Sequence, residues 1–144
     1  MVRTGLDILI EDKSLQKEFT GNVGLLCHNA SIDSNCNHAA LLFKQIFQSR
    51  FIKLFGPQHG FATDVQDNMV ETDHTVHPYL KIPVYSLYSE TRIPTDEMLE
   101  GIDHLFIDLQ DIGCRMYTYI YTLTNILEQC KTKDIEIILL DLPN

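Results

Sequence analysis

Five short apolar runs punctuate the chain, and segments with a helical pattern of apolar residues separate several of them. The runs cover residues 22–29, 51–60, 83–90, 104–111 and 135–144. Each run has the length of a strand and is apolar on both faces, which is typical of parallel strands covered by helices on each side. The pattern predicts an α/β fold: an open, doubly wound, mostly parallel sheet with helices on both faces.

Three segments carry the helical pattern. Residues 37–50 place an apolar stripe on one helix face, with Asn37 as the expected cap. Residues 93–101 predict a short helix that Thr95 caps and Gly101 ends. The segment 117–131 has helical spacing as well. The apolar positions are Ala39, Leu42, Phe43, Ile46 and Phe47 in the first segment and Ile120, Leu123 and Leu127 in the last.

Polar side chains follow the predicted strands. In an open parallel sheet, the ligand crevice lies beyond the carboxyl ends of the strands, so these residues are expected at one edge. They are His28 and Asn29, Gln58 and His59, Glu90, Gln110 and Asp111, and Asp141. Loops are polar in any protein, but ionisable groups at four of five strand ends favour a functional rim.

The composition narrows the range of partners. The chain has 144 residues, 44% of them apolar, which suits one domain. Its 20 acidic and 11 basic side chains give a net charge of −9, which disfavours nucleic acid and anionic membranes as partners. No apolar run reaches the roughly 18 residues of a membrane span, and the first residues lack the pattern of a signal peptide. The localisation stays open.

Several common chemistries lack their motifs. The sequence contains no GxGxxG, no GxxxxGK[ST] and no GxSxG, so neither nucleotide binding nor serine hydrolase chemistry is supported. The four cysteines, Cys27, Cys36, Cys114 and Cys130, form no CxxC pair. We expect them to be buried reduced thiols.

A polar loop of the sequence is rich in groups that bind metals. Within it lie His59, Asp64, Asp67, Asp73, His74 and His77. Their spacing fits no HExxH-type template, so we predict no metal site. A metal-dependent hydrolase stays as a minor alternative.

Paired carboxylates suit glycoside cleavage, in which one acid protonates the leaving oxygen and a second group stabilises or attacks the cation. Glu90 is the best candidate acid, because it follows a run that contains Tyr85 and Tyr88. Asp111, expected at the neighbouring strand end, is the second carboxylate, and Asp67 competes with it. Arg115, Tyr117 and Tyr119 would contact a sugar ring.

These residues lie in segments that resemble a known family. "GLLCHNASID", "LFGPQHGF", "VQDNM", the block from Pro83 to Tyr119 and "LDLPN" are similar to the NamZ-type exo-β-N-acetylmuramidases, a bacterial family. The resemblance implies a Rossmann-like N-terminal domain over residues 1–144, with a C-terminal domain that this chain lacks and a site between the two. It implies release of N-acetylmuramic acid from peptidoglycan fragments, as in cell wall recycling, without a cofactor or metal.

The residues and the resemblance together give the expected roles; the resemblance itself covers His59, Glu90, Asp111 and Arg115, whereas His28 departs from the family's usual residue. Glu90, Asp111 and His59 are the expected catalytic residues. The residues expected to bind the muramyl sugar are His28, Asn29, Asp67, Gln110, Arg115, Tyr117 and Tyr119. A periplasmic, secreted or cytoplasmic location would each fit the family. The alternative is a module that binds a muramyl sugar or a partner domain without turning the sugar over.

Overall fold

The computed structural model describes residues 3–58, 61, 74–88, 91–110 and 118–141. Its centre is a six-stranded sheet with the order β3-β4-β2-β1-β5-β6. The strands are β1 (Val23–Cys27), β2 (Phe51–Gly56), β3 (Thr75–Val76), β4 (Pro83–Ser86), β5 (His104–Asp108) and β6 (Glu136–Leu139). The helices are α1 (Gly5–Glu11), α2 (Lys13–Glu18), α3 (Ala39–Phe47), the 3₁₀ turn η1 (Gln48–Arg50), α4 (Asp96–Leu99) and α5 (Tyr119–Cys130).

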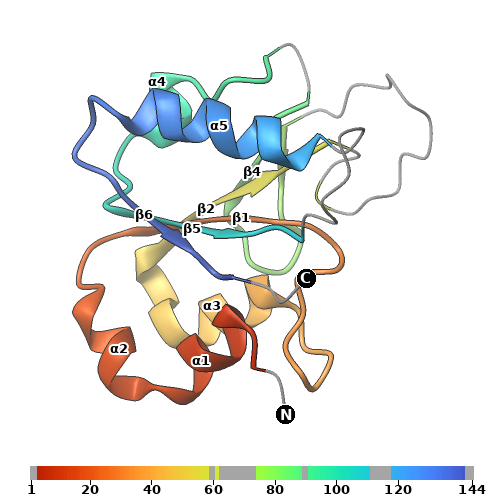
Figure 1. Ribbon diagram of the computed structural model, residues 1–144, viewed down its shortest axis with the longest axis vertical. Helices are drawn as coiled ribbons and strands as arrows, with labels where there is room; N and C mark the ends of the chain where they lie inside the picture. The colour runs from red at the N-terminus through yellow and green to blue at the C-terminus, as the bar shows by residue number, and fades with distance from the viewer. Residues whose placement is uncertain (1–2, 59–60, 62–73, 89–90, 111–117, 142–144) are drawn as a thin grey trace.

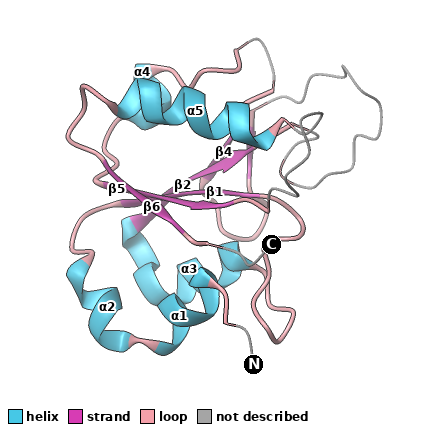
Figure 2. Ribbon diagram, in the orientation of Figure 1, coloured by secondary structure: helices cyan, strands magenta, loops and turns pink. Residues whose placement is uncertain are grey.

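Helices cover both faces of the sheet, as the sequence predicts (Figures 1 and 2). α1, α2 and α3 lie on one face, and α4 and α5 lie on the other. The chain passes from β1 to β2 and on to β4, then crosses back over β2 and β1 to β5 and β6. Connections between parallel strands are right-handed. The helices in connections that lead from β1 toward β4 and those in connections that lead back toward β6 therefore lie on opposite faces of the sheet.

Each face of the sheet has its own apolar core. On the α1–α3 face, the fully buried ring of Phe43 is central, with centroids 5.3 Å from Phe47 and 5.1 Å from Phe106. Truncating such a ring to alanine costs about 3–5 kcal/mol. The second core joins strand residues to α4 and α5; it contains Leu26, Phe55, Leu87, Met98, Leu99, Ile102, Leu105, Ile107, Ile126 and Cys130.

α5 buries a different stripe from the one that the sequence indicates. Ile120 and Leu127 are 47% and 45% exposed, and Leu123 is partly buried. The buried residues are Tyr119, Thr122, Ile126 and Cys130. Both stripes have helical spacing, so the period predicts the helix without deciding which side of it meets the sheet.

The caps confirm one prediction and correct another. Thr95 Oγ1 accepts a hydrogen bond from the Met98 N–H at 3.3 Å, and Gly101 follows α4 with a φ of +77°. Asn37, in contrast, is not the cap of α3. His38 holds that place, where its Nδ1 accepts from the Ala40 N–H at 3.2 Å, because Asn37 instead bonds to Asp33.

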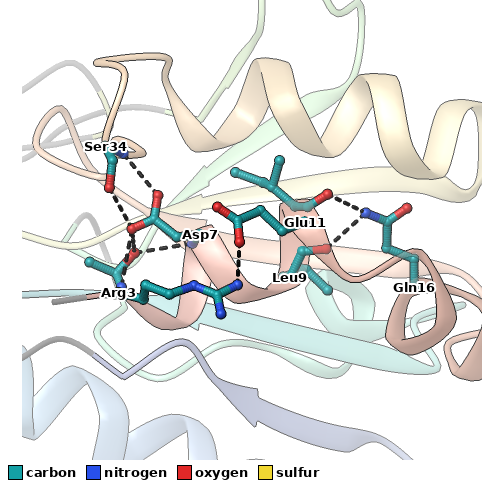
Figure 3. Close-up of polar contacts among 8 residues, drawn as sticks. Arg3, Asp7, Leu9, Glu11, Gln16 and Ser34 are labelled. Carbon is teal, nitrogen blue, oxygen red and sulfur yellow. Dashed lines mark hydrogen bonds and ion pairs between the residues drawn. The ribbon is translucent and has the colours of Figure 1, made fainter. Parts of the chain in front are cut away.

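Three elements were not predicted from the sequence. β3 is a two-residue strand that pairs with β4 in the antiparallel direction. α1 and α2 precede β1 and are joined through Gln16, whose Nε2 donates to the carbonyl oxygens of Leu9 and Ile10 (Figure 3). The start of α1 also meets the end of β6, where the Gly5 N–H donates to the Asp141 carbonyl at 2.8 Å. An added Cβ at Gly5 would lie 2.6 Å from the Asp141 nitrogen, so this close approach requires glycine.

The cysteine prediction holds in part. Cys27 and Cys130 are buried and free, but Cys36 is free and exposed. Cys36 lies outside the core because it belongs to the polar turn before α3, where its φ is +63°. Cys114 lies outside the described residues. No helix in the described part of the chain has the length and apolar character to cross a membrane.

Candidate functional site

Five strands of the sheet run parallel, so their carboxyl ends share one edge. β1 pairs in parallel with β2 and β5, β2 with β4, and β5 with β6. The strand order reverses between β1 and β5, because the chain first extends the sheet on one side of β1 and then on the other. In open α/β sheets, ligands bind at such a switch point. The topology therefore assigns the candidate site to the ends of β1 and β5.

His28 follows β1 directly. It is 6% exposed, and its Nε2 has no hydrogen-bond partner among the described residues. Its ring packs edge-on against Tyr119 at the start of α5, with centroids 5.1 Å apart. Burial, together with the nearby His38, lowers the pKa of His28 to about 4, so the imidazole is neutral at pH 7. Asn29, the next residue, is exposed.

Asp108 ends β5 and is opposite Cys27 in the ladder. Its side chain is 1% exposed, and its Oδ2 has no hydrogen-bond partner among the described residues. Burial raises the pKa of Asp108 to about 7. Burial also raises the pKa of the Cys27 thiol, and the charge of Asp108 adds to this effect. Gln110, two residues beyond Asp108, is exposed.

His28 and Asp108 are the two side chains in the described part of the chain that hold a buried polar atom without a partner. Leaving a buried donor or acceptor unpaired costs about 1–3 kcal/mol. Native structures contain few such atoms, and they often mark functional places. Both belong to the two strand ends that flank the switch point, although the structure gives no direct contact between them.

The start of α5 is joined to the end of β2. Thr118 Oγ1 donates to Gln58 Oε1 at 2.5 Å, and Gln58 is buried. This bond brings a polar pair from two distant segments to the edge that carries the site. Tyr119, predicted to contact the sugar, is 4% exposed and packs on His28, so it supports the site from within.

Most of the predicted site residues lie outside the described residues. These are Glu90, Asp111, His59, Asp67, Arg115 and Tyr117. Their convergence therefore stays a prediction, although His59 follows Gln58, Asp111 follows Gln110 and Glu90 follows β4. Two positions after Glu90 in the sequence, Arg92 has an aromatic partner, since its guanidinium lies 4.7 Å from the ring centroid of Tyr88.

One relation between the predicted carboxylates is wrong. Asp111 was expected at the strand end next to that of Glu90, but β4 and β5 are not neighbours. The connection between them crosses the sheet, so β2 and β1 lie between the two strands. Three strand spacings amount to roughly 14 Å. Sequence order alone could not reveal this crossing.

Two histidines of the polar loop with candidate metal ligands, His74 and His77, are among the described residues, and both form hydrogen bonds within the fold. His74 Nδ1 accepts from the Ser86 N–H at 3.1 Å, and its ring packs on Tyr85. His77 Nδ1 accepts from the N–H groups of Tyr79 and Leu80. Within the described ranges, no three His, Cys, Asp or Glu side chains are grouped as metal ligands would be. The other candidate ligands of this loop lie outside those ranges.

Sequence reasoning did not select Asp108 or Thr118 as site residues, and it placed Gln58 at the polar rim without giving it a role. One signal was present for Asp108, because an acidic residue closes an otherwise apolar strand in "HLFID". The pairing of Gln58 with Thr118 had no such signal, since 60 positions separate the two residues.

Comparisons with known proteins show the family to which the chain belongs. The family described as "Exo-beta-N-acetylmuramidase NamZ, N-terminal" matches residues 23–144. The chain is 36% identical over 144 residues to the peptidoglycan beta-N-acetylmuramidase NamZ of Bacillus subtilis (strain 168). The aligned region covers 99% of this chain and 34% of that protein.

Two solved structures have the same fold. A DUF1343 family protein from Bacteroides fragilis NCTC 9343 matches with a TM-score of 0.83 and 34% identity, over 99% of this chain and 35% of that one. A second DUF1343 protein from the same strain matches with a TM-score of 0.75 and 22% identity, with the same coverage. The chain thus spans about a third of the length of these relatives.

Proposed function

The chain belongs to the exo-β-N-acetylmuramidase NamZ N-terminal family, and on that premise we propose that it forms the sheet-bearing N-terminal part of a peptidoglycan glycosidase. The substrate would be a muramyl sugar at the non-reducing end of a peptidoglycan fragment, and the product N-acetylmuramic acid. The activity named for the Bacillus subtilis relative, a peptidoglycan beta-N-acetylmuramidase, supports this substrate class. The partner would be a second domain equivalent to the rest of that relative, which would complete the cleft.

The observation that carries the proposal is the edge of the sheet at the switch point. It combines parallel strand ends, polar loops and two buried polar atoms that have no partner among the described residues. A purely structural edge gains nothing from such atoms, because each one lowers stability. A sugar site, in contrast, uses polar groups held in fixed places on a rigid sheet.

Glu90 acts as the general acid in this proposal. It protonates the leaving oxygen, while a second group stabilises or attacks the developing cation at the sugar ring. Asp111 is the proposed second group, and His59 assists from the end of β2, which is adjacent to β4 in the sheet. A working pair of carboxyls needs a separation of ~5 Å for retention or roughly 6.5–9.5 Å for inversion. Because β4 and β5 are not adjacent, the two side chains must reach inward over β2 and β1.

The test is release of N-acetylmuramic acid from a muramyl disaccharide and from a nitrophenyl muramide. It is run with this chain alone and with this chain fused to the remaining two-thirds of the Bacillus subtilis relative. We expect release by the fusion. A fusion that folds and binds the sugar but releases none would contradict the glycosidase proposal and favour the binding module.

Glu90→Gln in the active protein identifies the acid. The substitution keeps the shape of the side chain but removes its transferable proton, so turnover of the disaccharide should fall roughly 10²–10⁴-fold. The nitrophenyl substrate should lose less, because its leaving group departs without protonation. Asp96→Asn is the control, since Asp96 pairs with Lys133 beside α4, before the start of β5 and away from the carboxyl edge. Equal turnover by Glu90→Gln and the parent would remove Glu90 from the mechanism.

A module that binds the sugar without turnover is the second candidate. The observation that favours it is the length of the match, since the chain spans only about a third of the length of the relatives it matches. Titration of muramyl sugar into this chain alone, followed by NMR, separates the two. Binding without any release by either protein would support this candidate.

A further inference from the structure

The side chain of Ser31 connects the two strand ends that flank the switch point. Its Oγ donates a hydrogen bond to the Asp108 carbonyl at 2.6 Å and accepts one from the His28 N–H at 3.1 Å. The residue is 2% exposed, so water does not compete for these bonds. One hydroxyl thus contacts the backbone of both β1 and β5, at the positions where each strand ends.

The place of this contact in the ladder is specific. Cys27 and Asp108 are the last pair in the described register between β1 and β5. Beyond that pair, the two strands diverge into loops that carry the exposed polar residues Asn29 and Gln110. Among the described residues, the Ser31 hydroxyl is therefore the last hydrogen-bonded link between the two strand ends before these loops begin.

Ser31 is itself held in place by the backbone. Its N–H donates to the His28 carbonyl at 3.0 Å, and its carbonyl accepts from the Ala39 N–H, at the start of α3, at 2.8 Å. The His38 ring reinforces the turn: its Nδ1 accepts from Ala40, so Nε2 carries the proton and donates to the His28 carbonyl at 3.1 Å. The hydroxyl accordingly has little freedom to move.

We propose that Ser31 is a positioning residue of this family's reaction: its hydroxyl fixes the ends of β1 and β5 relative to each other at the switch point. This inference rests on the proposed function where it concerns the reaction. Its geometric part, the placement of the β5 end by a hydroxyl from the β1–α3 loop, stands independently. Ser31 touches no reacting group in this scheme.

The expected effect is on turnover more than on affinity. Ser31→Ala leaves the His28 N–H and the Asp108 carbonyl without this buried partner, and the loops beyond them shift relative to each other. Misplacement by about 1 Å can reduce a rate about 100-fold. We expect kcat to fall roughly 10- to 100-fold while KM changes less than about threefold.

Ser34→Ala is the matched control. Ser34 lies in the same loop, and its Oγ also donates a hydrogen bond, in this case to the carboxylate oxygen Asp7 Oδ2 at 2.7 Å (Figure 3). That bond ties the loop to α1 and not to a strand end. Ser31→Thr is the rescue variant because it restores the hydroxyl. If Ser31→Ala does not fold, Ser31→Cys replaces it, because a thiol is only a weak donor.

The experiment has an arm that needs no activity. In ¹⁵N-labelled chain, Ser31→Ala should shift the amide signals of Leu109 and Gln110, which are far from residue 31 in sequence, and speed exchange of the His28 amide. Ser34→Ala should leave these signals unchanged. Unchanged Leu109 and Gln110 signals in folded Ser31→Ala would overturn the inference.

The kinetic arm uses the active fusion. A fall in kcat for Ser31→Ala, recovered by Ser31→Thr and absent in Ser34→Ala, supports the inference. Equal kcat values for Ser31→Ala and Ser34→Ala would overturn it, even with equal losses of stability. If the parent fusion releases no muramic acid, the proposed function fails instead, and the NMR arm still decides the geometric part.

Discussion

Two buried aspartates in this chain have opposite surroundings. Asp7, in α1, accepts hydrogen bonds from the backbone and side chain of both Thr4 and Ser34 (Figure 3). Asp108, at the end of β5, has an Oδ2 without a partner among the described residues. Burial alone would raise the pKa of Asp7, but its hydrogen bonds lower it to about 2. Burial of Asp108 is not compensated, and its pKa rises to about 7.

The difference teaches how the two regions are used. The α1 region places its carboxylate where donors converge, so the charge helps to hold the loop before α3. The switch point places a carboxyl group where ionisation is penalised. Buried groups with perturbed pKa values concentrate at functional sites, whereas partnered ones are commonly structural. The contrast therefore separates a stabilising region from a region whose polar groups lower stability.

Asp108→Asn gives the largest expected effect on this contrast. With a pKa of about 7 folded and 3.8 unfolded, Asp108 binds protons more readily in the folded state, so the parent loses stability as pH rises from about 4 to 7. A shift of this size corresponds to at most about 4 kcal/mol. Asn cannot ionise, so the advantage of the variant should grow between pH 4.5 and pH 8. Urea unfolding at pH 4.5 and pH 8 measures the difference in free energy of unfolding between variant and parent. The same difference at both pH values would contradict the raised pKa of Asp108.

His28→Phe sharpens the contrast from the other strand end. The pKa of His28 is about 4 folded and 6.5 unfolded, so the parent loses stability as pH falls from about 6.5 to 4. Phe keeps a ring against Tyr119 but cannot be protonated. As pH falls across this range, the free energy of unfolding of the variant should rise relative to that of the parent by up to about 3 kcal/mol. The lowered pKa values of His38 and His77 act alike in both proteins and cancel. If the difference in free energy of unfolding between variant and parent did not change with pH, the lowered pKa of His28 would be contradicted.

Asp7→Asn tests the partnered side of the comparison. The amide cannot accept all the bonds that the carboxylate accepts, so we expect a loss of about 1–3 kcal/mol at pH 7. The pKa of Asp7 is lowered, so its contribution is present above pH 4 and disappears as pH falls through about 2. The cost of Asp7→Asn should shrink over the same interval in thermal unfolding. An Asp7→Asn protein more stable than the parent at pH 7 would break the comparison.

The smallest expected effect concerns the thiols. Burial raises the pKa values of Cys27 and Cys130, whereas Cys36 is exposed in the loop before α3. Brief maleimide treatment at pH 7 should therefore modify Cys36 while Cys27 reacts only after unfolding. Peptide mass spectrometry reads the sites directly. Rapid modification of Cys27 in the folded chain would show that the end of β1 opens to solvent.

The local elements could be predicted from the sequence alone. Runs apolar on both faces predicted β1, β2, β4, β5 and β6, and helical spacing predicted α3 and α5. Thr95 and Gly101 marked the ends of α4, because caps and left-handed glycines depend on neighbouring residues alone. The segments from Pro83 to Tyr119 also carried the family resemblance, which the match over residues 23–144 confirms.

Which of these elements contact one another depends on the packing of distant segments and could not be predicted from local patterns. The crossing from β4 to β5 separates the strands that precede Glu90 and Asp111 and places the switch point between β1 and β5. The buried stripe of α5, the pairing of Gln58 with Thr118 and the link through Ser31 also depend on contacts between distant segments. The same holds for Asp108 Oδ2, which has no partner among the described residues. Periodicity and capping are properties of a few consecutive residues. Burial and hydrogen-bond partnership belong to the packed chain, because they depend on every segment that covers a given atom.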